Sequence, residues 1–159
     1  EAFLFQADLT DVKNITKFFD ATIEKFGGID IAINTVGKVL KKPFADTTEE
    51  EYDSMNDINA KVAYFCIQEA GKKLNDNGKI NTKAPVEHFT RAASKEFGSR
   101  GISVTAVAPG PMDTPFFYGQ ESDDAVAYHK QASDLRGLTD IAVIAPLVGF
   151  LVTDGWWVT

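Results

Sequence analysis

Short apolar runs alternate along this chain with longer amphipathic stretches, and this alternation limits the possible folds more than any other feature of the sequence. Residues 3–7, 29–33 and 102–108 are apolar at most positions, as expected of strands that are buried on both faces. The stretches between them carry apolar residues at helical spacing. The sequence therefore predicts an α/β fold, in which a doubly wound parallel sheet has helices on both faces.

Four helices are expected, each with a start or stop signal. Two overlapping capping boxes, Thr47 with Glu50 and Thr48 with Glu51, precede the second of them. Lys79 begins another strand, which is expected to break off after two residues. The predicted helices span residues 12–26, 49–74, 84–97 and 140–151.

Composition is that of an ordinary globular domain, with 44% hydrophobic and 25% charged residues, so residues 1–159 are expected to form one domain. The net charge of −7 argues against nucleic acid or an acidic membrane surface as a partner. No apolar run approaches the roughly 20 residues that span a bilayer. The single cysteine, Cys66, fits a reducing compartment, and we expect a cytoplasmic protein. The two histidines, His88 and His129, do not form a metal pair, so no metal is expected.

Three segments carry a resemblance to a known family: residues 78–80, residues 81–97, and the run Ala108-Pro109-Gly110-Pro111-Met112-Asp113-Thr114. Together they resemble the classical short-chain dehydrogenases/reductases. The resemblance implies a Rossmann-like domain that binds NAD or NADP, with NADP favoured. It also implies hydride transfer between the nicotinamide and a carbonyl or alcohol carbon of a small molecule, in a homo-tetramer or homo-dimer.

Lys83 corresponds in this resemblance to the catalytic lysine, which binds the nicotinamide ribose and lowers the pKa of a tyrosine four positions earlier. Here that earlier position is Lys79, so the tyrosine is absent from the sequence. The family's catalytic serine is absent as well. We expect that a segment of a longer protein is missing between Ile80 and Asn81. The first βαβ unit, with its glycine-rich phosphate loop, is also expected to be missing.

Ligands of doubly wound sheets bind beyond the carboxyl ends of the strands, which directs attention to the residues after each strand. Asp8 matches a family residue that binds adenine, although it could equally cap the next helix. The turn Asn34-Thr35-Val36-Gly37 keeps the outer two residues of the family's Asn-Asn-Ala-Gly turn. Gly37 lets the backbone approach the dinucleotide, and Asn34 is expected to tie neighbouring strands together. By itself, an Asn-x-x-Gly sequence indicates a turn and no particular function.

The remaining candidate residues lie on a helix and after the last strand. Asn59 matches an asparagine of the family's proton relay. Pro109, Gly110, Met112 and Thr114 match the family's nicotinamide contacts, with Thr114 on the carboxamide. The aromatic residues 116–118 and the polar stretch 119–134 match a substrate lid, or are an ordinary surface loop, and Trp156-Trp157 resembles a subunit interface.

Two alternatives to an enzyme remain open at this stage. One is a catalytically inactive relative that binds dinucleotide as a sensor, which the changed inner turn residues Thr35 and Val36 favour. The other is a structural or interaction protein, which applies if Ile80 and Asn81 are directly bonded in the native protein. The substrate has no signature in this sequence.

Overall fold

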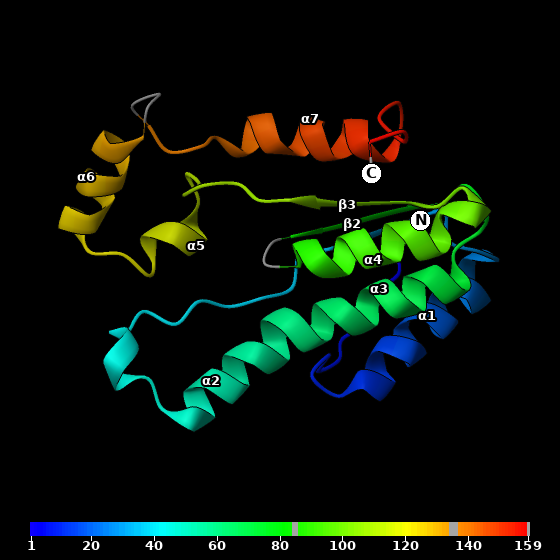
Figure 1. Ribbon diagram of the computed structural model, residues 1–159, viewed down its shortest axis with the longest axis horizontal. Coiled ribbons are helices and arrows are strands. Elements are labelled where there is room, and N and C mark those ends of the chain that lie inside the picture. Colours follow the sequence, from blue (N-terminus) through cyan, green and yellow to red (C-terminus); the bar gives the residue numbers. More distant parts are fainter. Residues whose placement is uncertain (84–85, 134–136, 159) are drawn as a thin grey trace.

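A three-stranded parallel sheet forms the centre of the computed structural model, which describes residues 1–83, 86–133 and 137–158. The strands are β1 (Ile31–Asn34), β2 (Lys79–Lys83) and β3 (Ser103–Val107), in the order β1-β2-β3. In the register of the sheet, Ile33 lies beside Asn81, and Asn81 lies beside Thr105. All three strands therefore end at the same edge, on the left in Figure 1.

Helices cover both faces of this sheet, as the sequence predicts. Figure 1 shows α1, α3 and α4 on one side and α7 on the other, while α5 and α6 lie beyond the carboxyl ends of the strands. The long helix predicted at residues 49–74 is interrupted by a π-helical turn, η2. The helical elements are α1 (Val12–Phe26), η1 (Phe44–Asp46), α2 (Glu49–Asn56), η2 (Asp57–Lys61), α3 (Val62–Lys73), α4 (Glu87–Phe97), η3 (Gly98–Arg100), α5 (Pro115–Tyr118), α6 (Asp123–Ala132) and α7 (Ile141–Val152).

Local hydrogen bonds confirm several of the predicted helix ends. Gly27 ends α1 in the left-handed conformation, with φ of 85°. Of the two possible capping boxes, Thr48 with Glu51 forms: the Glu51 amide donates to Oγ1 of Thr48 at 3.3 Å, and the Thr48 amide donates to Oε2 of Glu51 at 2.9 Å. Asp140 caps α7 by accepting from the Ala142 amide at 2.8 Å.

The prediction of a strand at residues 3–7 was wrong. This segment has no strand neighbour among the described residues, and an extended segment without one has no ladder to join. It lies instead along α1, where the ring of Phe5 is 5.8 Å from that of Phe18 and the ring of Phe3 is 6.4 Å from that of Phe26.

The prediction that the next strand breaks off after Ile80 was also wrong. β2 continues through Asn81 and Thr82 to Lys83, paired with β1 as far as Thr82 and with β3 as far as Lys83. Lys83 therefore stands at the end of a strand and not at the start of a helix. Of the helix predicted at residues 84–97, the first two positions lie outside the described residues, and α4 begins at Glu87.

The hydrophobic core lies between the sheet and the helices α1, α3 and α4. Ile15 of α1, Val62 of α3 and Val104 of β3 are fully buried, and Leu74 and Ile80 are nearly so. Burying side chains of this size stabilises the fold by about 2 kcal/mol each. Among the described residues, none of the helices has both the length and the apolar character that crossing a membrane requires.

Candidate active site

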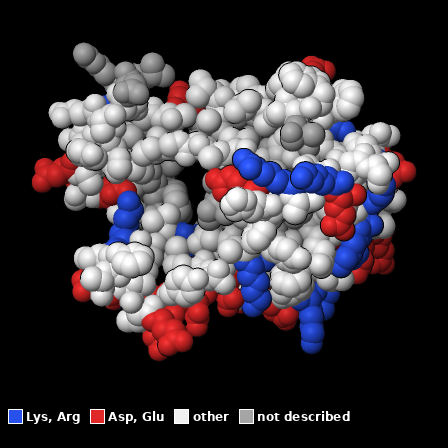
Figure 2. Space-filling view, viewed as in Figure 1, with Lys and Arg blue, Asp and Glu red and all other residues white. Residues whose placement is uncertain are grey.

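A cavity of about 720 Å³ opens at the edge of the sheet where the three strands end. Figure 2 shows this opening as a hollow between the segment that carries α5 and α6 and the segment that carries η1 and α2. The position agrees with the rule that doubly wound sheets bind ligands beyond the carboxyl ends of their strands. The described residues that line it are Thr35, Gly37, Val39, Lys41, Lys83, residues 107–112, Thr114, Phe116, Phe117, Gln120, Glu121 and His129.

Most of the predicted site residues meet at this cavity, although they come from segments far apart in the sequence. Asn59 lies beside it and contacts Lys83. Asn34 and Val36 line a second, more apolar cavity of about 330 Å³ along β1 and α1. The predicted residues that line the first cavity are Thr35, Gly37, Lys83, Pro109, Gly110, Met112 and Thr114.

Lys83 is held at the end of β2 by two neighbouring segments. Its Nζ lies 3.4 Å from Oδ1 of Asn59. A methyl group placed on Gly37 would overlap Nζ and would lie 2.5 Å from Oδ1 of Asn59, so only glycine leaves room for the amino group here. Burial lowers the pKa of Lys83 below the ordinary value of a lysine, because desolvation disfavours the charged form.

Asn59 joins the loop after β1 to the long helix. Its Oδ1 accepts from the Lys38 amide at 3.1 Å, while its Nδ2 donates to the carbonyl oxygens of Lys38 and Met55, both at 3.0 Å. The residue lies in the π-helical turn η2, a type of helix distortion that occurs often at functional sites. These bonds fix the orientation of Oδ1 toward Lys83.

Asn34 behaves differently from the prediction, which had its side chain tie neighbouring strands together. Its Oδ1 accepts from the Val36 amide at 3.1 Å, inside the turn that follows β1. Within the described part of the chain, its Nδ2 is buried without a hydrogen-bond partner, as is Oγ1 of Thr82 in β2. A buried polar atom without a partner costs free energy, so both atoms are candidates for contacts with further groups.

Two backbone hydrogen bonds join the segment after β3 to Thr139, which precedes α7. The Asp113 amide donates to the Thr139 carbonyl, and the Thr139 amide donates to the Pro111 carbonyl, both at 2.9 Å. Thr114 caps α5, because its Oγ1 accepts from the Phe117 amide at 3.3 Å. Since a hydroxyl used as an acceptor keeps its own proton, Thr114 can still donate to a ligand in the cavity.

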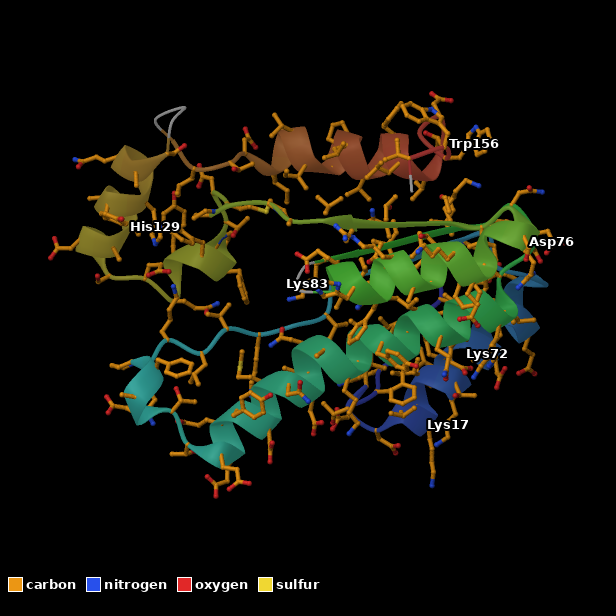
Figure 3. The ribbon with its side chains drawn as sticks, in the orientation of Figure 1. Lys17, Lys72, Asp76, Lys83, His129 and Trp156 are labelled. Atoms are coloured by element: carbon orange, nitrogen blue, oxygen red, sulfur yellow. The ribbon has the colours of Figure 1, made fainter. Side chains whose placement is uncertain are left out.

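The aromatic run, which the sequence leaves open as a substrate lid or an ordinary surface loop, contributes residues to the cavity wall. Phe116 and Phe117 line the cavity from α5, and the ring of Phe117 lies 5.6 Å from that of His129 on α6. Figure 3 shows His129 and Lys83 on the two sides of the opening. Of the predicted lid stretch at residues 119–134, the last residue lies outside the described part of the chain.

Sequence reasoning missed two charged residues of the cavity wall. Lys41, in the loop after β1, forms an ion pair with Glu121, which precedes α6. The rule of examining residues after each strand would have found Lys41 if applied to the whole loop. Glu121 carries no such signal, because 80 positions separate it from its partner.

Asp8 and Asn59 are the predicted site residues that line neither cavity, but Asn59 contacts Lys83 of the first cavity, whereas Asp8 bonds to Thr10. Oδ1 of Asp8 accepts from the amide of Thr10 at 2.9 Å and from the hydroxyl of Thr10 at 2.7 Å, and these bonds lower the pKa of Asp8. Asp11 caps α1 instead. A role of Asp8 in binding adenine stays a prediction.

Comparison with known proteins gives the family. A family model described as enoyl-(acyl carrier protein) reductase matches residues 1–82 and 80–158. A short-chain type dehydrogenase/reductase of Picea abies is 30% identical over 99% of this chain and 67% of its own length. A protein of Burkholderia cenocepacia, described as a dehydrogenase and solved with bound NADP, is 56% identical with a TM-score of 0.96, over all of this chain and 69% of its own. A short-chain dehydrogenase from Oenococcus oeni is 50% identical with a TM-score of 0.75, over 99% of this chain and 68% of its own. The chain belongs to the short-chain dehydrogenase/reductase family, a family of oxidoreductases.

Two of these matches are not continuous one-to-one alignments with this chain. The family model matches in two parts that meet at residues 80–82. The alignment with the Picea abies protein runs over 181 positions, which exceeds the 159 residues of this chain by 22. At least that many aligned positions of the relative therefore have no counterpart here.

Proposed function

We propose that this protein is an NAD(P)-dependent oxidoreductase that moves a hydride between the nicotinamide and the carbonyl or alcohol carbon of a small molecule. The observation that carries the proposal is the convergence of Lys83, Asn59 and Gly37 beside the segment 109–114 in one cavity. Family membership supports the same class of reaction. We favour NADP over NAD because a relative 56% identical was solved with bound NADP.

The residues around the cavity fit a nicotinamide nucleotide. Gly37 has no side chain, so the amino group of Lys83 can lie beside it at the cavity wall, and the proton of the Thr114 hydroxyl is free to bind a carboxamide oxygen. The bound nucleotide would donate or accept the hydride. Lys83 would hold the nicotinamide ribose, and its ammonium group, oriented by Asn59, would carry the proton relay.

We further propose that the native protein contains a segment between Ile80 and Asn81, and that this segment carries the serine and the tyrosine of the reaction. The two-part family match and the longer alignment support this. On the strand β2, Lys79 and Lys83 stand about 13 Å apart at 3.3 Å per residue. A side chain four positions before Lys83 therefore lies beyond its reach along this strand, whereas on a helix the two would be neighbours.

We also propose that another strand pairs with the free edge of β1, as part of the βαβ unit expected before residue 1. Strands of parallel sheets are normally buried, yet Ile31 is 43% and Ile33 is 50% exposed. The unpartnered Nδ2 of Asn34 lies at the same strand. The intact mass of the native protein tests both additions, because 17.4 kDa is the mass without them.

A homo-oligomer is part of the proposal. Helix α7 has no charged residue, and Trp156 and Trp157, just beyond it, are 59% and 66% exposed. Exposed apolar surface of this kind commonly marks a subunit interface. We expect Trp157→Glu to lower the mass of the native protein measured by light scattering, whereas an unchanged mass would rule out this surface as the interface.

The experiment that tests the reaction is a turnover assay with the native protein. We expect NADPH to be oxidised in the presence of an aldehyde or ketone, with one alcohol formed for each NADPH consumed. A panel of alkyl and aromatic carbonyl compounds samples the unknown substrate. Binding of NADPH without turnover of any compound would favour a nucleotide sensor over an enzyme.

A further inference from the structure

We propose that the ion pair between Lys41 and Glu121 makes the cavity selective for uncharged carbonyl substrates. This inference rests on the proposed function, since it names the substrate class of the same cavity. Lys41 comes from the loop after β1 and Glu121 from the segment between α5 and α6, so the pair spans the outer part of the cavity.

The two side chains of this ion pair differ in burial. The side chain of Glu121 is only 9% exposed, whereas that of Lys41 is 51% exposed. A buried carboxylate without its partner costs several kcal/mol. An anionic substrate that took Lys41 as its own partner would leave Glu121 unpaired and would lie next to a second negative charge. Lys41 is therefore not free to bind an anion while Glu121 is charged.

Most other residues that line the cavity are apolar. Among the described residues of the cavity, the full charges are Lys41, Glu121 and Lys83. Lys83 stands across the cavity next to Asn59, where the proposed reaction uses its charge. Val39, Phe116, Phe117 and His129 line the same cavity as the pair, and the rings of Phe117 and His129 are in contact. These side chains would contact an alkyl or aromatic substrate, and apolar contacts of this kind favour a neutral molecule.

The test compares two aromatic aldehydes that differ by one para carboxylate group, benzaldehyde and para-carboxybenzaldehyde. We expect the native protein to reduce the neutral aldehyde with at least about tenfold higher kcat/KM. Glu121→Gln keeps the size of the side chain and frees Lys41, so the ratio should shift about tenfold toward the carboxylate. Lys41→Met combined with Glu121→Gln removes the freed cation and should return the ratio to its native value.

A second variant and a binding measurement ensure that the experiment gives a result even if the first variant does not fold or no aldehyde is reduced. Glu121→Ala frees Lys41 by a second route if the glutamine variant does not fold. If no aldehyde is reduced, calorimetric titration with benzoate and benzyl alcohol measures the same preference without catalysis, which separates this inference from the proposed function. The inference is overturned if freeing Lys41 leaves the preference unchanged, or if the double variant shifts as far as the single one.

Discussion

Replacing Lys83 by methionine is expected to abolish most of the activity while leaving the protein folded. Methionine has a similar length but no charge, so the strand end stays filled while the ammonium group beside Asn59 is lost. Proton transfer by a positioned side chain contributes about 10²–10⁴-fold to rate, and we expect kcat to fall within this range. Because burial lowers the pKa of Lys83, the activity of the native protein should decline at a lower pH than the ordinary titration of lysine.

Lys95→Met is the matched control, because Lys95 is an exposed lysine of α4 far from the cavity lining. Its kcat and its thermal unfolding temperature should stay at the native values. Steady-state rates of NADPH oxidation, with circular dichroism as the measure of folding, compare the two variants. Native activity in the Lys83→Met variant would remove this residue from the reaction.

Gly37→Ala is expected to reduce activity about 10- to 100-fold with little change in stability. The added methyl group would overlap Nζ of Lys83 and crowd Oδ1 of Asn59. Asn59 is held by three other hydrogen bonds, whereas the end of a lysine side chain moves easily. Lys83 should therefore move away, and a 1 Å misplacement of a reacting group can cost about 10²-fold in rate.

Gly98→Ala separates this effect from a general effect of alanine. Gly98 has φ of −58°, and a methyl group there would meet no atom within 4 Å. We expect native kcat, and a free energy of unfolding within about 1 kcal/mol of the native value, for this control. Denaturant unfolding and NADPH oxidation, measured on both variants, check the prediction. A Gly37→Ala protein as active as the control would show that the function of Lys83 does not depend on the absence of a side chain at position 37.

The helices of this protein could be predicted from the sequence because their signals are local. The capping pair Thr48 and Glu51, the left-handed Gly27 and the capping Asp140 each act within a few residues of the end they mark. The segment at residues 3–7 could not be predicted in this way. Its composition is that of a strand, but a strand also needs a neighbour, and a local pattern does not report whether one is present.

The residues of the cavity also differ in whether the local sequence predicts them. Lys83 and the segment 109–114 were predicted because each belongs to a recognisable run of residues, and the structure brings both to one edge of the sheet. The strand that carries Lys83 was not predicted, since three polar residues follow Ile80. Pairing with β1 and β3 overrides their local preference. The pairing of Lys41 with Glu121 arises only from the tertiary fold.

Titration of the native protein with NADPH, followed by the fluorescence of the nicotinamide, measures whether the cavity at the strand ends binds the nucleotide. We expect saturable binding at one site per chain, tighter for NADPH than for NADH, and weakened by Lys83→Met but not by Lys95→Met. Absence of saturable binding of either nucleotide, in a native protein of confirmed intact mass, would contradict the proposed function.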